Sequence, residues 1–400
     1  MSIKSSAARR TRAFAAAAGV CAVGLVLSAC GSGSSSSSGA PASGAAGGGG
    51  CSSSNGADVA AAKAAVDTAT GLPKYEPLSS GGPIGKADWK SKLVYEIKYA
   101  DYPYNQAISK AVVDGLKVAG VRTRVVNGDG TPQSWAAGIQ AAIADHADAI
   151  NLNGFAPEYV APQIKEAQAA GIIVTEDTTY GTPQQMPPPI IHGGTSGVWS
   201  LEGKGFVDKI VADACGPTEI LYVHGSDIGG NDKQMKAGFD AELKAVCSGC
   251  SVVEVDQPVA KWADLAQPIA AALTAHPDIR YIAAGYDSGM VPGIEAGIKQ
   301  AGINNNYRVA TGDGSASIIG TIKPGSLVMA DIGQGVTWVG DAIATNILRQ
   351  LAGGKPHIYT AIPRMFDESN ASEAGDPPSY TSGFGDSSAW TEEIQQLLNG

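Results

Sequence analysis

Short β-rich runs alternate with helical patterns along most of the chain, and this alternation constrains the fold more than any other feature. The β-rich runs occupy residues 93–99, 122–126, 149–152, 172–175, 220–224, 252–255 and 281–284. The helical patterns occupy residues 107–119, 135–145, 159–170, 198–214, 233–246 and 265–275. Strand–helix–strand units of this spacing form parallel sheets that helices cover on both faces. The sequence therefore predicts an α/β protein.

Two lobes are expected, because residues 57–400 are too many for one small core. A Pro-rich stretch at residues 183–189 interrupts the alternation, which then resumes. We therefore predict two doubly wound parallel-sheet lobes with a connection near residues 192–195.

The N-terminus has the order of a secretory signal. A basic tip with Lys4 and three arginines precedes the apolar residues 13–27, and Leu27-Ser-Ala-Cys30 follows. This order resembles bacterial lipoprotein precursors, which implies removal of residues 1–29, lipidation of Cys30 and an extracytoplasmic, membrane-anchored protein. The alternative is an uncleaved membrane helix, but its apolar run falls short of the roughly 20 residues that a spanning helix needs. Residues 30–56 are Gly/Ser-rich and predict a flexible linker.

The charge balance argues against nucleic acid as a partner. The chain carries 28 cationic and 38 anionic residues. The signal contains four cations and no anion, so the rest has 24 minus 38, a formal net charge of −14. Such an excess of negative charge disfavours binding to nucleic acid and to anionic membrane surfaces. It does not discriminate between an enzyme and a binding protein.

The cysteines of the folded part predict a disulfide. Cys215 and the pair Cys247 and Cys250 precede β-rich runs that could be neighbouring parallel strands. We therefore expect Cys215 to pair with Cys247 or with Cys250, as suits an oxidising compartment. Cys51 lies in the linker and is expected to be exposed, without a partner. No metal is predicted, because a structural zinc site needs four ligands and no histidine is placed to complete one.

Candidate ligand-binding residues follow the predicted strands, since open parallel sheets bind ligands at their carboxyl ends. These segments are residues 99–105, 153–155, 176–178, 225–232, 257–262, 286–288, 312–314 and 332–334. They are rich in carboxylates, amides and aromatic rings and contain no evident nucleophile–base pair. The loop at 225–232 lacks the Gly-Lys-Ser/Thr ending of a P-loop, so we expect no nucleotide and no cofactor.

Several of these motifs, taken in order, resemble the sugar-binding periplasmic proteins of the ribose type, the solute receptors of ABC importers. The longest is Leu273-Thr-Ala-His-Pro-Asp-Ile-Arg-Tyr-Ile-Ala-Ala-Gly-Tyr-Asp-Ser-Gly-Met290. Others are Tyr102-Pro-Tyr-Asn105, Gly171-Ile-Ile-Val-Thr-Glu-Asp177, Lys236-Ala-Gly-Phe239 and Gly312-Asp-Gly314. The resemblance covers about residues 92–366.

The resemblance implies two lobes joined by three hinge strands, with crossings near His192, near Gln334 and at residues 362–366. The first lobe would comprise residues 88–193 and 335–361, and the second lobe residues 194–334 and 362–400. Residues 57–87 read as an Ala-rich helix followed by a Pro/Gly-rich connection. A short helix near 390–398 would pack on a lobe.

Ligand contacts can be carried over from the family position by position. The first lobe would contribute Tyr104, Asn105, Asn153 and Asp177. The second would contribute Lys233, Tyr286, Asp287, Asp313 and Gln334, with Trp262 stacked on a sugar face. Tyr286 and Lys233 depart from the Asn and Arg of the family pattern, which leaves a hexose, a polyol or a modified sugar open rather than ribose.

Each of these residues also has a purely structural interpretation. Asp177 and Asp313 could cap the following helices, Tyr104 and Asn105 could only shape a helix entry, and Trp262 or Lys233 could lie on the surface.

Other functions also remain open. Two carboxylates suffice for a glycosidase, and three carboxylates with Tyr99, Tyr104, Trp262 and Tyr286 could enclose an organic cation. The resemblance favours a monomeric binding protein over an enzyme. Its closed form, populated by ligand, would be read by an ABC permease or by a signalling receptor.

Overall fold

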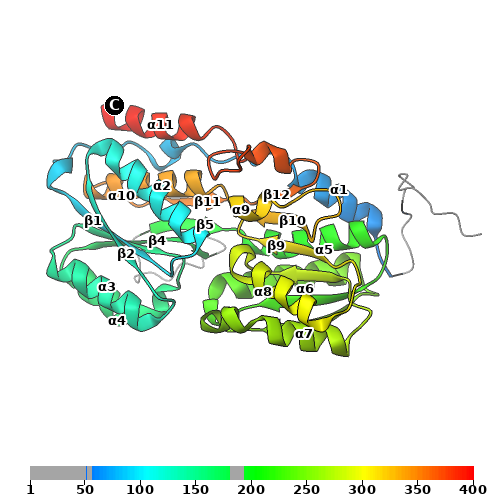
Figure 1. Ribbon diagram of the computed structural model, residues 1–400. Coiled ribbons are helices and arrows are strands. Elements are labelled where there is room, and N and C mark those ends of the chain that lie inside the picture. Colours follow the sequence, from blue (N-terminus) through cyan, green and yellow to red (C-terminus); the bar gives the residue numbers. More distant parts are fainter. Residues whose placement is uncertain (1–50, 52–55, 181–192) are drawn as a thin grey trace, which may run out of the picture. The chain divides into compact units, whose positions relative to one another are not determined.

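The computed structural model describes residue 51, residues 56–180 and residues 193–400, which contain two six-stranded sheets (Figure 1). The predicted signal, Cys30, most of the linker and His192 lie outside the described residues. Among the described residues, no helix has the length and apolar character needed to cross a membrane.

The first sheet has the strand order β11-β5-β4-β3-β1-β2, and all its pairs are parallel. Its strands are β1 (Leu93–Lys98), β2 (Arg122–Asn127), β3 (Ala149–Asn153), β4 (Ile173–Tyr180), β5 (Gly193–Gly197) and β11 (Ile358–Ala361). Its helices are α2 (Pro103–Ala119), α3 (Pro132–Ala144), α4 (Ala161–Ala169) and α10 (Val336–Leu351). Helices α2 and α10 pack together above the sheet in Figure 1, and α3 and α4 pack together below it.

The second sheet has the order β12-β10-β9-β8-β6-β7 and is parallel except for β12, which is antiparallel to β10. Its strands are β6 (Glu219–His224), β7 (Ser251–Asp256), β8 (Tyr281–Ala284), β9 (Arg308–Gly312), β10 (Val328–Gly333) and β12 (Arg364–Asp367). Its helices are α5 (Trp199–Ala214), α6 (Gly230–Val246), α7 (Ala266–Ala275), α8 (Asp287–Ala301) and the short α9 (Ala316–Ile319). The two parallel-sheet α/β lobes confirm the predicted fold class.

Sequence patterns explain these elements. The central strands β3 and β10 are buried along their whole length, as expected for strands covered on both faces. The edge strands β2 and β7 are largely exposed and carry charged side chains. Helix α2 begins with Pro103 in its first turn and ends at Gly120, whose φ of 83° is left-handed and suits a residue without a Cβ.

Three short segments connect the lobes: residues 197–199, 333–336 and 361–364. The first lies farther along the chain than expected. Residues 194–197 were predicted to begin the second lobe, but β5 pairs with β4 and β11 of the first sheet. The sequence of β5, Gly-Gly-Thr-Ser-Gly, has one β-branched residue and no apolar alternation, so no strand signal marked it.

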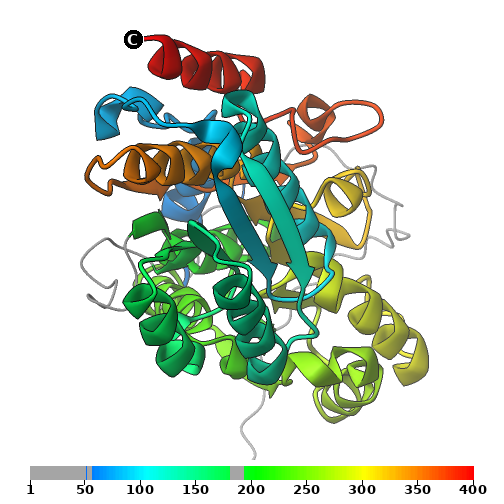
Figure 2. The ribbon, with the colours of Figure 1, turned by 90° about the vertical axis from the view of Figure 1, so that its left-hand side faces the viewer.

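The terminal segments cross between the lobes as well. Helix α1 (Val59–Ala69) packs against α5 of the second lobe, and the chain then passes through the 3₁₀ turns Leu78–Gly81 and Trp89–Ser91 into β1. Helix α11 (Ser387–Asn399) packs on α2 and α10 of the first lobe (Figures 1 and 2). Residues 387–399 were expected in the second lobe, and that prediction is wrong. The apolar side of α11, with Ile394 fully buried, completes the core of the first lobe.

Tyr75 lies where the N-terminal connection meets the crossings. Its hydroxyl accepts a hydrogen bond from the Gly335 N–H at 2.9 Å and donates one to the Ile362 carbonyl at 3.2 Å. Its ring stacks on Trp338, with centroids 4.5 Å apart. Arg364 extends the contact, since its guanidinium donates to the carbonyl of Thr70 and pairs with Glu373. We call residues 70–87 the N-terminal strap.

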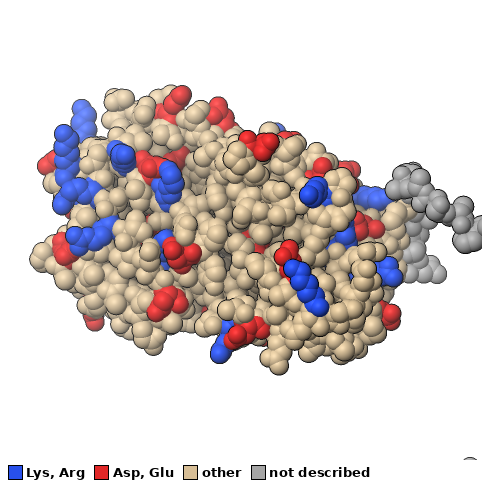
Figure 3. All heavy atoms as spheres, in the orientation of Figure 1, with Lys and Arg blue, Asp and Glu red and all other residues tan. Residues whose placement is uncertain are grey.

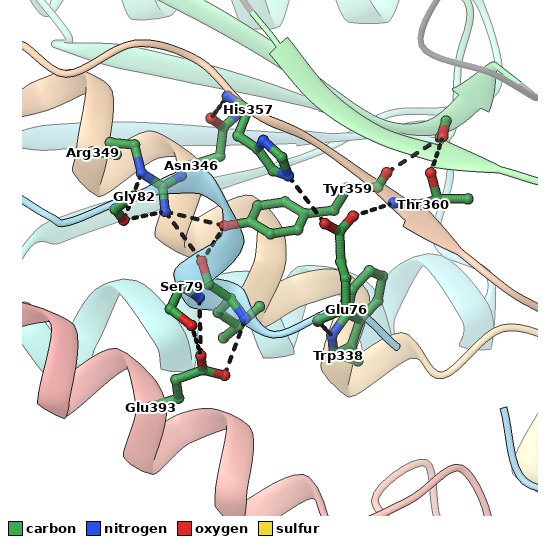
Figure 4. Close-up of polar contacts among 12 residues, drawn as sticks. Glu76, Ser79, Gly82, Trp338, Asn346, Arg349, His357, Tyr359, Thr360 and Glu393 are labelled. Atoms are coloured by element: carbon green, nitrogen blue, oxygen red, sulfur yellow. Dashed lines mark hydrogen bonds and ion pairs between the residues drawn. The ribbon is translucent and has the colours of Figure 1, made fainter. Parts of the chain in front are cut away.

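Polar side chains, among them the buried Arg349, fix the N-terminal strap to the first lobe (Figure 4). The Arg349 guanidinium donates to the carbonyls of Leu78 and Gly82 at 3.2 and 3.0 Å. The Glu76 carboxylate accepts the Thr360 N–H at 3.1 Å, and the Glu393 carboxylate of α11 accepts the Leu78 N–H at 3.0 Å. The N-terminal strap is therefore an integral part of the fold.

The disulfides differ from the expected pairing. Cys51 pairs with Cys215, and Cys247 pairs with Cys250. Gly56 and Asp58 dock on the turn that carries the second pair, because the Asp58 N–H donates to the Val246 carbonyl and the Gly249 N–H donates to the Gly56 carbonyl. This docking brings Cys51 to Cys215. The spacing between the β-rich runs could not reveal it, because the contact depends on the tertiary position of α1.

Candidate functional site

A cavity lies between the lobes, at the carboxyl ends of both sheets. It is lined by Tyr99, Tyr102, Tyr104, Asn105, Gly154, Asp177, Thr178, Thr179, Trp199, Ile228, Asn231, Trp262, Tyr286, Ser288, Gly289 and Asp313. The space that the centre of a water molecule can reach is about 50 Å³. The lobes touch beside it, since the Tyr159 hydroxyl donates to the Asp227 carbonyl at 2.9 Å. The arrangement is therefore closed and suits a small molecule.

Aromatic rings form much of the cavity wall. Trp262, in the turn after β7, stacks on Tyr286 of the second lobe with ring centroids 5.4 Å apart and contacts Tyr102 of the first lobe at 5.6 Å. Its indole N–H donates to the Gln257 carbonyl at 2.9 Å, which fixes the ring plane. Gly289 allows this position, because a Cβ there would lie 2.2 Å from the indole. Flat aromatic faces of this kind suit the C–H surface of a sugar ring.

The first lobe contributes a buried carboxylate. Asp177 lies in the second half of β4, and its Oδ1 accepts a hydrogen bond from the Gly154 N–H at 2.9 Å. Its Oδ2 is buried without a hydrogen-bond partner. Burial raises the pKa of Asp177 well above its usual range, and the neighbouring Glu96 and Glu176 raise it further. This oxygen is therefore available for a hydrogen bond with a ligand, and the carboxyl group can donate when protonated and accept when ionised.

The neighbouring amides are locked in place behind the cavity wall. Asn105 lines the cavity and donates to the Asn153 side-chain oxygen at 3.0 Å. Asn153 in turn donates to Glu96 at 2.8 Å. Asn153 thus orients Asn105 and does not itself line the cavity.

The second lobe contributes Asp313, directly after β9. Its φ is 95°, a strained backbone conformation for a residue with a Cβ. Thr178, across the cavity, also has a positive φ of 42°. Burial raises the pKa of Asp313 well above its usual range, with further contributions from Asp287 and Glu202. Backbone strain of this kind is concentrated at functional sites, which supports a ligand-binding role for both positions.

Two predicted residues of the second lobe stand behind the wall. The Asp287 carboxylate accepts the Ser315 N–H at 2.6 Å and the Ser315 hydroxyl at 2.8 Å. Gln334 donates to Glu202 at 3.3 Å. Asp287 holds the loop that carries Asp313, and Gln334 lies at the second crossing.

The structure brings together six of the ten predicted ligand contacts as lining residues: Tyr104, Asn105, Asp177, Trp262, Tyr286 and Asp313. The prediction for Lys233 is wrong, because its side chain is exposed and does not line the cavity. Asn231 is the lining residue of that turn. Lys233 follows two positions later, roughly 200° around the helix, and so it points away.

Sequence reasoning missed several lining residues. Tyr102 and Asn231 lie in segments that were singled out, but nothing distinguished them from their neighbours. Tyr99 was named only for the alternative of a cationic ligand. Trp199 had no signal, because β5 before it was not recognised as a strand. Its indole N–H donates to the Thr178 carbonyl, which ties the first crossing to the cavity.

The side chains that line the cavity offer neither a cation nor a metal site. The lining contains no Lys, Arg, His or Cys. Within the described part of the chain, no group of three His, Cys, Asp or Glu side chains is arranged to hold a metal ion. On the face shown in Figure 3, acidic and basic side chains are interspersed and form no continuous basic strip.

Comparison with known proteins identifies the family of this chain. Residues 94–356 match the family model described as periplasmic binding protein domain. No curated protein matches the sequence.

Solved structures of similar fold include an ABC sugar transporter subunit from Rhodobacter sphaeroides, with 20% identity, coverage of 70% of this chain and 99% of that one, and a TM-score of 0.61. An ABC transporter solute-binding protein from Agrobacterium vitis with bound allitol has 18% identity, coverage of 71% and 97%, and a TM-score of 0.62. One from Burkholderia graminis in complex with D-arabinose has 19% identity, coverage of 71% and 98%, and a TM-score of 0.61. The chain thus belongs to the periplasmic binding protein family, a family of solute-binding proteins rather than enzymes.

Proposed function

We propose that this protein is an extracytoplasmic receptor that captures one sugar or polyol molecule between its lobes and delivers it to an ABC permease. The observation that carries the proposal is the cavity itself, in which aromatic faces surround Asp177 of one lobe and Asp313 of the other. Carboxylates accept short, strong hydrogen bonds from ligand hydroxyls, and indole and phenol rings pack on C–H faces. The similar structures with bound allitol and D-arabinose support the same ligand class.

Capture follows from ligand contacts on both lobes. Tyr104 and Asp177 belong to the first lobe, and Trp262 and Asp313 to the second. A ligand that touches both sets binds the closed form better than an open form, so it shifts the population toward closure. The closed form would then present both lobes to the permease as one surface.

The site also predicts which ligands fail. No basic side chain lines the cavity, so a phosphate or carboxylate group would be buried beside Asp177 or Asp313 without a cation. Like charges in a buried site repel strongly. We therefore expect sugar phosphates and sugar acids to be rejected.

A thermal-shift screen tests the proposal. The panel contains neutral aldoses, ketoses and polyols, the corresponding sugar acids, and sugar phosphates. A ligand at 100 times its Kd adds about 2.7 kcal/mol of stability, so a true ligand raises the melting temperature clearly. Stabilisation by a neutral compound supports the proposal. Stabilisation only by anionic compounds contradicts it.

Lipid anchoring through Cys30 is a further part of the proposal, and it rests on the Leu27-Ser-Ala-Cys30 sequence. In cells that process lipoproteins, the wild-type chain is expected in the membrane fraction. The Cys30→Ser variant is expected to lose the lipid adduct by mass spectrometry. An unmodified Cys30 in the wild-type protein would rule the anchor out.

A further inference from the structure

Several buried polar groups at the cavity lack a hydrogen-bond partner. Asp177 Oδ2 and Asn231 Oδ1 are buried oxygens without a hydrogen-bond partner, and both residues line the cavity. Behind the wall, Glu202 Oε2 and Gln334 Oε1 are also buried and unpaired. These four atoms can only accept hydrogen bonds if the carboxyl groups are ionised. The Tyr104 and Tyr286 hydroxyls of the lining are also buried and unpaired, and they can donate or accept. A complementary ligand therefore offers donors to the four oxygens and groups of either kind to the two hydroxyls.

The cavity is unbalanced in charge. Burial raises the pKa of the Tyr104 phenol, and Asp313, Asp177 and Glu202 raise it further through their negative charge. Asp177 of the first lobe and Asp313 of the second lobe both line the cavity with Tyr104, whereas Glu202 lies behind the wall. The nearby buried cation Lys98 is already paired, with its Nζ 2.7 Å from Asp101, and it does not line the cavity.

A neutral ligand supplies hydrogen-bond donors to the cavity but no positive charge. Hydroxyl groups donate hydrogen bonds but bring no positive charge, so the two buried carboxyl groups either keep their protons or stay as anions without a counter-charge, which is costly in an environment of low polarity. An ammonium group supplies three N–H donors and a positive charge at the same place. The faces of Tyr104, Trp262 and Tyr286, which line the cavity, add favourable cation–π contacts.

We propose that the ligand is a hydroxyl compound bearing a primary amine, an amino sugar or amino polyol, whose ammonium group lies between Asp177 and Asp313. This inference rests on the proposed function and narrows its ligand class. The hydroxyl groups of the ligand would occupy the remaining acceptors, and its ring or chain would lie against Trp262.

Calorimetric titration with matched pairs tests the inference, because an amine and a hydroxyl at one carbon are nearly equal in size. The pairs are D-glucose with D-glucosamine, D-galactose with D-galactosamine and D-mannose with D-mannosamine, each at pH 6.5, where the amines are charged. We expect the amine of the best pair to bind at least about 10-fold more tightly than its hydroxyl partner.

Variants separate charge from shape. Asp177→Asn keeps the size of the side chain and removes its charge, so it should weaken the amine more than the matched hydroxyl compound. Asp313→Asn is the second variant, for use if the first does not fold. Lys233→Ala, on the exposed face of α6, is the control and should leave both affinities unchanged.

Three outcomes are distinguishable. Preference for the amine that disappears in the Asn variants supports the inference. Equal or tighter binding of the neutral partner overturns the inference and leaves the proposed sugar-binding function intact. Absence of binding by every compound of these pairs and by every neutral aldose, ketose and polyol of the thermal-shift panel overturns the proposed function as well.

Discussion

The Tyr75 hydroxyl accepts a hydrogen bond from the Gly335 N–H at 2.9 Å, although the two residues are 260 positions apart. Gly335 lies in the second crossing between the lobes. The same hydroxyl donates to Ile362 at 3.2 Å, in the third crossing. One side chain from the N-terminal strap therefore joins two of the three segments about which the lobes would move, in an arrangement where the cavity is closed.

Tyr75→Phe tests whether this contact favours closure. The phenylalanine ring keeps the stack on Trp338 but loses both hydrogen bonds. Two neutral hydrogen bonds contribute about 0.5–1.5 kcal/mol each, and if opening breaks both of them the ligand affinity should fall by about 5- to 150-fold. Calorimetry on the variant measures this, although Tyr75 does not line the cavity. Unchanged affinity with reduced stability would mean that the contact is the same in the open and closed forms.

Peptide mapping without reduction checks the disulfides. Trypsin cleaves after Lys233 and Lys244 and so separates Cys215 from the Cys247–Cys250 pair. We expect a peptide containing Cys51 to be linked to the Cys215 peptide, and an internal disulfide in the peptide that follows Lys244. A link between Cys215 and Cys247 or Cys250 would contradict the structure.

Asp341 predicts a dependence of stability on pH. Burial raises its pKa to about 7, with a smaller contribution from the charge of Asp114. Between the unfolded pKa and this value the folded state holds the proton more tightly. The contribution to stability is therefore present at low pH and is lost as the pH rises from about 4 through 7.

Asp341→Asn removes this loss. The variant should be more stable than the wild type at pH 8, by at most about 4 kcal/mol, and the difference should vanish near pH 4. Urea unfolding at several pH values measures the effect. A difference that is constant with pH would show that Asp341 is not the group responsible.

The fold could be predicted because its elements carry local signals. Strands such as Glu219–His224 contain a continuous apolar run, here residues 220–223, and the helices between the strands have regular spacing. The strand Gly193–Gly197 was missed because its pairing is imposed by neighbours rather than by its own side chains. The position of α11 and the partner of Cys51 were missed for a related reason: both depend on surfaces that exist only after the lobes have formed.

The site could be predicted in part. Asp313 directly follows β9, and Asp177 lies opposite the last residue of β3. Both positions are at the carboxyl ends of parallel strands, where such sheets bind ligands. Lys233 was expected at the cavity but does not line it. Alignment to a motif gives only a position in the chain, whereas the rotation of the helix decides which side chain faces the cavity. The supporting roles of Asn153 and Asp287 required the hydrogen bonds of the structure.

Calorimetric titration of Trp262→Ala and Lys233→Ala with the compound that most stabilises the wild type tests the central claim most directly, namely that the interlobe cavity is the binding site. Trp262 forms the aromatic wall and Lys233 is exposed outside it. After a thermal melt has shown that both variants are folded, Trp262→Ala should weaken binding by about 100-fold and Lys233→Ala by less than about 2-fold. Wild-type affinity in Trp262→Ala would contradict the claim.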